Sequence, residues 1–227
     1  MDSYTIDPAV RALGVVFRAA IVRGVAAGKK DPRVERAKKR AALAAASVDL
    51  AANPILRGYR ALFAAVGATD EGAMASPEWL LRLLARRGTL PTINTVVDTY
   101  NAVSVERLIV ASAHDLDTLR GAVRVVRTTG REVFCPLGST TGEPLRTGEW
   151  AAVDDTHALC RMNCKQSDVS KVRADTTNLF IFIYTQGNRA TDEAYVRDSL
   201  VAVCERIVEM NGGVYRLLPE RADDSYA

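Results

Sequence analysis

The strongest constraint on the fold is a run of six apolar residues, Leu-Phe-Ile-Phe-Ile-Tyr, at positions 179–184. A strand with one solvated face alternates apolar and polar residues, whereas this run is apolar at both alternating sets of positions. The sequence therefore predicts that residues 178–184 form a strand in the middle of a sheet. A chain of 227 residues, 48% of them hydrophobic, can bury a sizeable core as one large domain or two small ones.

The rest of the pattern is helical early and rich in strands late. After a first apolar strand at residues 13–22, helical spacing predicts helices at residues 29–46, 54–67, 77–86 (with Ser76 as N-cap) and 91–104. Turn residues then separate short apolar segments, which predict strands at residues 107–111, 122–127, 131–135, 149–153, 158–162 and 178–184. A helix at 191–210 and a strand at 213–218 follow. The prediction is one mixed α/β domain over residues 10–218, without regular βαβ alternation, and a frayed tail at 219–227.

Charge and composition limit the kinds of binding partner and the cellular compartment that we expect for this chain. The net charge is +3, and seven basic residues against two acidic ones lie between Lys29 and Arg40. Two interpretations stay open for this segment: contact with a phosphate backbone, or a solvated helix face. The sequence contains no run of 18 apolar residues, so no membrane span is predicted. Residues 1–7 lack the pattern of a secretory signal, and four cysteines are too few to crosslink the chain. We expect a cytoplasmic protein with reduced thiols.

A polar stripe stands out in residues 90–104. Asn94, Asp98 and Asn101 share a helical face beside an apolar stripe, and Pro91 suits the opening turn. Asn and Asp propagate helices poorly, so a solvated face rarely uses them. Two interpretations remain: the stripe holds a ligand, or it is hydrogen-bonded to neighbouring loops.

Further polar residues follow the predicted strands. His114 lies just past a strand end, where reactive side chains are commonly displayed. Two interpretations remain for it, a structural histidine or a catalytic one. Two later segments add carboxamides, hydroxyls and one carboxylate: Asn163, Gln166, Ser167, Asp168, Thr176 and Asn178. The loop that carries them is either a solvated crossover or a wall of the site. The set contains no obvious nucleophile–base pair. It suits recognition of an amino-acid or sugar-like ligand and the positioning of a water molecule.

Metal and cofactor sites are not expected. The sequence lacks G-x-G-x-x-G, P-loop and G-x-S-x-G motifs. His157, Cys160 and Cys164 cluster, and Cys135 could approach them, but C-x3-C on a strand is not the spacing of a structural zinc knuckle. Core or loop thiols are the better interpretation.

Three segments carry a resemblance to a known family. Residues 90–104 match P-x-I-N-x-V-V-D-x-x-N-x-V, residues 112–117 match a following H-x-[FL]-D element, and residues 154–178 match a strand–loop–strand that ends in T-x-N. The chain resembles the B3/B4 domain of the phenylalanyl-tRNA synthetase beta subunit, in its free-standing form. The resemblance implies a mixed α/β domain containing an unusual β-sandwich with flanking helices.

The resemblance also implies a function. In the synthetase this domain is an editing module that hydrolyses tRNA carrying the wrong amino acid, and free-standing relatives look like editors acting in trans. The family's histidine carries over to His114. Its glutamate, which recognises the substrate side chain, falls on Asp168 when the count back from Thr176 and Asn178 has no gap, a departure that shortens the side chain by one methylene. A short gap in the loop places Lys165 or Gln166 there instead. The residues that size the family's pocket lie near 187–191.

We therefore expect a cytoplasmic hydrolase of mischarged aminoacyl-tRNA, with no cofactor. His114 would position or deprotonate a water molecule and Asp168 would recognise the amino acid. The expected substrate-binding residues are Asn94, Asp98, Asn101, Asn163, Gln166, Ser167, Thr176 and Asn178. The main alternative is a module that binds RNA or an amino-acid-like ligand without catalysis, and a weaker one is a protein-interaction domain. The sequence does not determine the amino acid, the tRNA or the oligomeric state.

Overall fold

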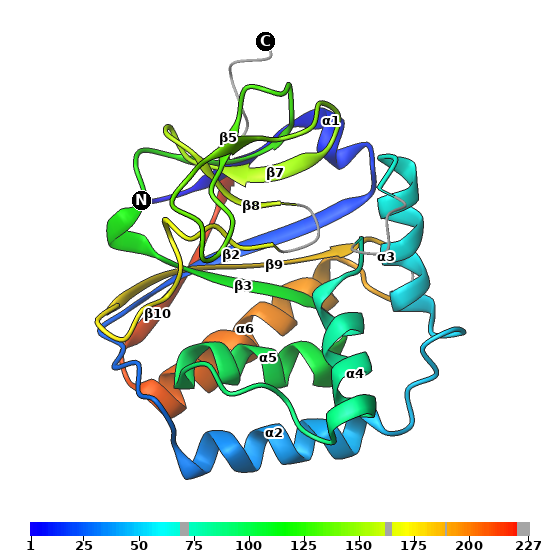
Figure 1. The fold of residues 1–227 in the computed structure, drawn as a ribbon, viewed down its shortest axis with the longest axis vertical. Helices are drawn as coiled ribbons and strands as arrows, with labels where there is room; N and C mark the ends of the chain where they lie inside the picture. Colours follow the sequence, from blue (N-terminus) through cyan, green and yellow to red (C-terminus); the bar gives the residue numbers. More distant parts are fainter. Residues whose placement is uncertain (69–72, 162–164, 189, 222–227) are drawn as a thin grey trace.

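The computed structural model describes residues 1–68, 73–161, 165–188 and 190–221. Within these residues the strands form two sheets, which pack face to face, and helices cover the outer face of the smaller sheet (Figure 1). The mixed α/β class and the sandwich with flanking helices are confirmed. None of the helices in the described part of the chain has the length and apolar character needed to cross a membrane.

The smaller sheet is antiparallel and contains four strands. Their order is β10 (Val214–Leu218), β2 (Val15–Arg23), β9 (Asn178–Gln186) and β3 (Val110–Asp115). The apolar run is in β9, which lies between β2 and β3 as predicted. Phe180, Phe182 and Tyr184 face the larger sheet, and Leu179, Ile181 and Ile183 face the helices. Both faces of β9 are thus buried, which explains why it lacks polar alternation.

The larger sheet has seven strands. Their order is β11 (Glu220–Arg221), β1 (Tyr4–Ile6), β4 (Val123–Arg127), β7 (Trp150–Val153), β8 (Ala158–Arg161), β5 (Val133–Phe134) and β6 (Glu143–Pro144). β1 and β11 lie outside the predicted limits of 10–218, yet they pair with each other, and Tyr4 and Ile6 are buried in the core. The structured chain is therefore longer at both ends than the sequence suggested, because strands of two or three residues carry too little periodicity to be recognised.

Six helices and one 3₁₀ turn complete the described structure. They are α1 (Pro8–Arg11), α2 (Pro32–Ala45), α3 (Pro54–Ala65), α4 (Ser76–Arg87), α5 (Thr95–Arg107), α6 (Glu193–Asn211) and η1 (Leu116–Thr118). α5 and α6 lie against the four-stranded sheet, α2 packs on the far side of α5, and α3 and α4 stand at one end (Figure 1). Asp31, Asn53 and Asp192 cap the helices that follow them.

Three predicted boundaries were wrong in ways that affect the site. α5 begins at Thr95 and not near Pro91, because the Asn94 side chain is its N-cap and accepts a hydrogen bond from the Val97 N–H at 2.9 Å. α5 also continues to Arg107, so β3 starts only at Val110 and His114 lies inside the strand. The N-cap of α4 is Ala75, without a side-chain hydrogen bond, and not Ser76.

Candidate functional site

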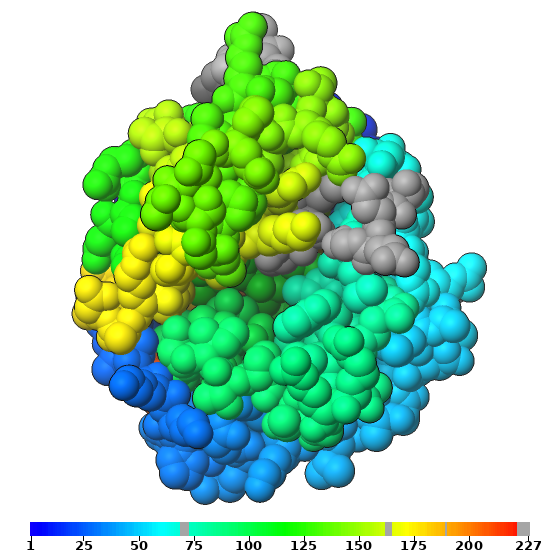
Figure 2. All heavy atoms as spheres, viewed as in Figure 1, coloured from blue at the N-terminus to red at the C-terminus, as the bar shows by residue number. Residues whose placement is uncertain are grey.

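A cavity of about 800 Å³ opens at the free edge of β3. It lies between α4 and α5 on one side and the β5–β6 loop and residues 165–172 on the other. Figure 2 shows this face hollowed between the yellow segment around residues 165–172 and the blue-green segment of α4. The size suits a small-molecule site, which is typically roughly 300–1,000 Å³.

The lining combines an apolar wall with a few polar groups. The apolar wall includes Trp79, Val97, Tyr100, Ala111, Phe134 and Val172. The polar groups are Ser76, Asn101, Ser112, Lys165, Gln166 and Lys171. Three large apolar side chains at the cavity stay partly in solvent, with exposed fractions of 47% for Trp79, 59% for Ile93 and 57% for Leu137. Exposed apolar groups around a cavity are typical of a ligand-binding mouth.

Of the predicted site residues that the structure describes, Asn101 and Gln166 line this cavity. Asn101 projects from α5, one turn beyond Val97. The amide nitrogen of Gln166 donates to the Ala113 carbonyl, which ties residues 165–172 to the edge of β3. Gln166 therefore both lines the cavity and holds one of its walls.

His114 is fully buried behind the wall. Its Nε2 is hydrogen-bonded to the Ser112 Oγ at 3.0 Å, its Nδ1 to the Ser170 Oγ at 2.9 Å, and its ring stacks on Phe182. Burial, helped by the charge of His157, lowers the pKa of His114 to about 3. The imidazole is therefore neutral at physiological pH, and of its two neighbours only Ser112 reaches the cavity lining.

The two residues of the T-x-N motif tie the predicted motif segments together. The Thr176 hydroxyl donates to Asp115 Oδ2 at 2.6 Å, and the Asn178 amide donates to Asp117 Oδ2 at 2.9 Å. Asp115 and Asp117 belong to the segment that carries His114. Thr176 and Asn178 thus stabilise the end of β3 and η1, and they lie outside the cavity lining. Their contact with substrate stays a prediction.

Asn94 and Asp98 also have structural partners. Asn94 caps α5, as described above. Asp98 is 1% exposed and accepts hydrogen bonds from the Ile93 N–H at 2.8 Å and from the Lys38 ammonium at 3.5 Å. Burial raises the pKa of the Asp98 carboxyl, against the opposing effects of the Ile93 N–H and Lys38. These two members of the polar stripe fit the second interpretation, hydrogen bonding within the fold.

Asp168 holds a neighbouring loop. Its carboxylate accepts from the Gly138 N–H at 2.8 Å and from Lys171 at 2.6 Å, and these partners lower the pKa of the carboxyl. The fixed loop carries Leu137, whereas Asp168 itself is outside the lining. Ser167 is fully buried and accepts from the Val169 N–H. Asn163 lies outside the described residues, and so does part of the predicted pocket-sizing segment at residue 189.

Ser112 and Trp79 were missed by the sequence-based interpretation. The predicted strand ends at residue 111, which places Ser112 in a loop. The sequence therefore does not show that Ser112 shares a strand face with the buried His114. Trp79 sits in a helical pattern in which aromatic residues usually belong to the core. Its half-exposed position depends on the packing of α4 against α5, for which a single sequence gives no signal.

The basic segment is only partly available to a ligand. Lys38 is 2% exposed and bonds Glu35, Thr92 and Asp98. Arg33 donates to the carbonyls of Glu209 and Met210 at the end of α6. Lys29, Lys30, Arg36, Lys39 and Arg40 are exposed. The five exposed side chains are accessible to a phosphate group, whereas the Lys38 ammonium is buried.

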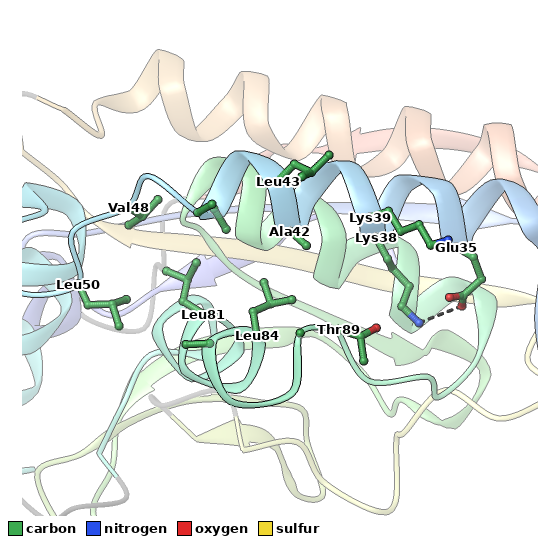
Figure 3. A pocket seen from close by; sticks show the side chains of 14 residues that line it. Glu35, Lys38, Lys39, Ala42, Leu43, Val48, Leu50, Leu81, Leu84 and Thr89 are labelled. Carbon is green, nitrogen blue, oxygen red and sulfur yellow. Dashed lines mark hydrogen bonds and ion pairs between the residues drawn. The ribbon is translucent and has the colours of Figure 1, made fainter.

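A second hollow, of about 670 Å³, lies between α2 and α4 (Figure 3). Its surface is largely alanine and leucine, including Ala42, Leu81 and Leu84, and the Glu35–Lys38 pair lies at one end. The lining contains none of the predicted site residues that the structure describes. Of the two hollows, the one at the edge of β3 is thus the one lined by predicted site residues that the structure describes.

His157, Cys135 and Cys160 each have hydrogen-bond partners within the protein. His157 Nδ1 contacts the Thr156 hydroxyl at 2.9 Å and Asp154. Cys135 and Cys160 are buried, and their thiols donate to the Ser139 carbonyl at 3.2 Å and the Arg161 carbonyl at 3.0 Å. Among the described residues, no group of three or more His, Cys, Asp or Glu side chains is arranged to hold a metal ion. Cys164 lies outside those residues.

Comparisons with known proteins agree with this architecture. No curated protein sequence matches the chain. Among solved structures, the fold is similar to an N-terminal fragment of the phenylalanyl-tRNA synthetase beta-subunit from Pyrococcus horikoshii, with a TM-score of 0.54 and 14% identity. That alignment covers 96% of this chain and 51% of the fragment, so the chain spans about half the fragment's length. At this identity the likeness establishes the fold alone. A model of the B3/4 domain matches residues 58–210, which is well over half of the sequence, and the chain therefore belongs to the B3/4 domain family.

Proposed function

We propose that this protein is a trans-acting editing hydrolase that removes the amino acid from mischarged aminoacyl-tRNA in the cavity at the edge of β3. The observation that carries the proposal is the coincidence of this cavity with the family's motif residues. Asn101 and Gln166 line it, and Ser112 connects it to His114. The similar solved structure named above is part of a tRNA synthetase, which supports aminoacyl-tRNA as the class of substrate.

The lining suits an amino acid with a large apolar or aromatic side chain. Val97, Tyr100 and Phe134 offer apolar surface in the same cavity as the carboxamide of Asn101. An apolar pocket gains free energy from burying a side chain, while a few polar groups fix the orientation of the ligand. The amino-acid side chain would lie on the apolar wall, with its ester toward Asn101, Gln166 and Ser112.

The proposed reaction is attack of water on the ester that joins the amino acid to the tRNA ribose. This ester is already labile, so orienting the water and the carbonyl supplies much of the required rate acceleration. No nucleophile–base pair is needed. Because the pKa of His114 is about 3, its imidazole suits positioning a group better than taking a proton from water. Asp168 would act indirectly, by fixing Leu137 and Lys171 at the cavity.

Trp79 gives the first test of the cavity. Trp79→Ala should raise the KM for aminoacyl-tRNA by about tenfold, because the half-exposed indole would be covered by ligand. The free energy of unfolding should change by less than about 1 kcal/mol, since a partly exposed side chain is removed. Leu43→Ala is the matched control, because Leu43 is 77% exposed in the other hollow. Equal effects of the two substitutions on KM would contradict a ligand at Trp79.

The exposed basic residues of α2 would contact the tRNA backbone. Lys39→Gln with Arg40→Gln should flatten the dependence of log K on log salt concentration by about one to two units, since each phosphate contact contributes about 0.7–0.9. Arg197→Gln with Arg216→Gln removes the same charge from two other exposed positions. An identical slope for both double variants would show that α2 does not bind RNA. Filter binding at four salt concentrations gives the slopes.

The proposed function is tested by deacylation of a panel of correctly and incorrectly charged tRNAs, with and without a chelator. We expect chelator-resistant release of the amino acid from a subset of mischarged tRNAs. Release from every tRNA alike, or from none, would count against an editing enzyme.

The burial of His114 favours one second candidate, a binding module without catalysis. In this case a non-hydrolysable aminoacyl-adenosine should raise the melting temperature of the protein while no tRNA in the panel is deacylated. Turnover of any mischarged tRNA well above the spontaneous rate would exclude this candidate.

A further inference from the structure

Three buried side chains form a continuous row of hydrogen bonds beside the cavity. Ser112 Oγ lies 3.0 Å from His114 Nε2, and His114 Nδ1 lies 2.9 Å from Ser170 Oγ. The exposed fractions are 2% for Ser112 and 0% for both His114 and Ser170. Ser112 and His114 are two residues apart on β3, so they share one face of the strand. Ser170 comes from the segment that pairs with the edge of β3 through the antiparallel bridge between His114 and Lys171.

The row reaches the cavity at one end only. Ser112 lines the cavity, whereas His114 and Ser170 are behind it among the described residues. The ring of His114 is fixed by stacking on Phe182, with the ring centroids 5.6 Å apart and the planes 12° from parallel. Any influence of the imidazole on a ligand therefore passes through the Ser112 hydroxyl.

We propose that Ser112 is the residue that contacts the reacting ester or the attacking water, and that His114 and Ser170 are positioning residues that fix the direction of its hydroxyl. This assignment rests on the proposed function, and it names a contact residue outside the motif positions. The family motif supplies the histidine, and the geometry at this edge of β3 supplies the serine.

The charge state of His114 supports positioning over proton transfer. At neutral pH a group with a pKa of about 3 is protonated in about one molecule in ten thousand. A neutral imidazole has one donor and one acceptor nitrogen, so it donates to one of the two serines and accepts from the other. The Ser112 hydroxyl uses one donor or acceptor position for the bond to His114 Nε2, which leaves its other positions for a group in the cavity.

The expected loss on removing this hydroxyl follows from its proposed partner. A single hydrogen bond to the oxygen that becomes negative in ester hydrolysis accounts for about 10²–10³-fold in kcat. Ser112→Ala should therefore lower kcat for deacylation by about 100-fold while KM stays within about threefold. Ser170→Ala should lower kcat less, by about tenfold, because it releases the ring without removing the contact. Ser199→Ala, at another fully buried serine on α6, should leave both constants unchanged.

A spectroscopic measurement tests the contact without relying on turnover. In protein labelled with ¹⁵N at histidine, the Nε2 resonance of His114 should move when adenosine carrying tyrosine through a 3′-amide is added. The resonance should not move in Ser112→Ala, although the probe still binds. In Ser170→Ala without probe, the proportion of the two imidazole tautomers should change.

The outcomes separate the two proposals. A probe-dependent shift that needs Ser112, without deacylation of any tRNA, would remove the proposed function and keep the contact. An unmoved Nε2 resonance in the wild-type protein, or kcat within threefold of wild type in a folded Ser112→Ala protein, would overturn the assignment. Melting temperatures of the variants establish that they fold.

Discussion

Asp98→Ala should lower the free energy of unfolding by about 3–5 kcal/mol, the cost of breaking a buried ion pair by removing one of its two side chains. Asp98 and Lys38 each have a side chain that is 2% exposed, and their charged atoms are 3.5 Å apart. The substitution would also leave the Ile93 N–H without the acceptor it has at 2.8 Å. Urea unfolding followed by circular dichroism measures the change.

Glu35→Ala is the matched control for this pair. Glu35 contacts the same ammonium at 2.9 Å, but its side chain is 39% exposed, so its loss should cost less than about 1 kcal/mol. Replacing both partners, Lys38→Met with Asp98→Leu, should recover at least half of the loss, because an apolar pair needs no charge compensation. If Asp98→Ala lowered the free energy of unfolding no more than Glu35→Ala, the description of Asp98 and Lys38 as a buried ion pair would be wrong.

Acidification should destabilise the protein through His114. The folded pKa is about 3 and the unfolded value is about 6.5, so between these values the unfolded chain binds a proton that the folded protein does not. Stability is therefore unaffected by this residue above pH 6.5 and falls as the pH is lowered toward 3. At about 1.4 kcal/mol per pH unit, His114 should account for about 3 kcal/mol lost between pH 6.5 and pH 4.

The readout is a difference between two pH dependences. The wild-type protein and His114→Gln are each unfolded in urea at pH 6.5 and pH 4, and the variant should lose about 3 kcal/mol less than the wild type over this interval. Lower stability of the variant at both pH values does not affect the comparison. Equal losses in the two proteins would mean that the imidazole is protonated in the folded state.

The sequence identified the core elements because their signals are local. The six-residue apolar run of β9 predicts a strand covered on both faces, and the sandwich with α5 and α6 provides that cover. Amphipathic spacing likewise predicted α3 and α6, and Gly88 ends α4 in a left-handed conformation with φ +70°. Such signals need only neighbouring residues.

The site depends on contacts that no local pattern encodes. The polar stripe of α5 was noticed, yet the partner that explains Asp98 is Lys38, 60 residues earlier in the chain. Thr176 and Asn178 contact residues 61 positions away, and Asp168 bonds a glycine 30 positions away. Polar side chains that secure loops have the same composition as side chains that bind a ligand, so composition alone could not separate them.

The position of one helix end explains why the sequence did not identify Ser112. The end of α5 at Arg107 displaced β3 by three residues, which placed Ser112 and His114 on one face of a strand instead of in a loop. Leu108, with a positive φ of 51°, makes the turn between the two elements. An apolar side chain rarely adopts this conformation, so the break could not be predicted from residue type.

The editing hypothesis is tested most directly by the first-order rate constant for amino-acid release from a mischarged tRNA at saturating protein concentration. The comparison is between the wild type and Asn101→Trp, which fills the cavity from a half-buried position of α5. We expect release well above the spontaneous rate for the wild type and a return to that rate for Asn101→Trp. Equal rates for the two folded proteins would contradict it, because hydrolysis would then occur somewhere other than the cavity at the edge of β3.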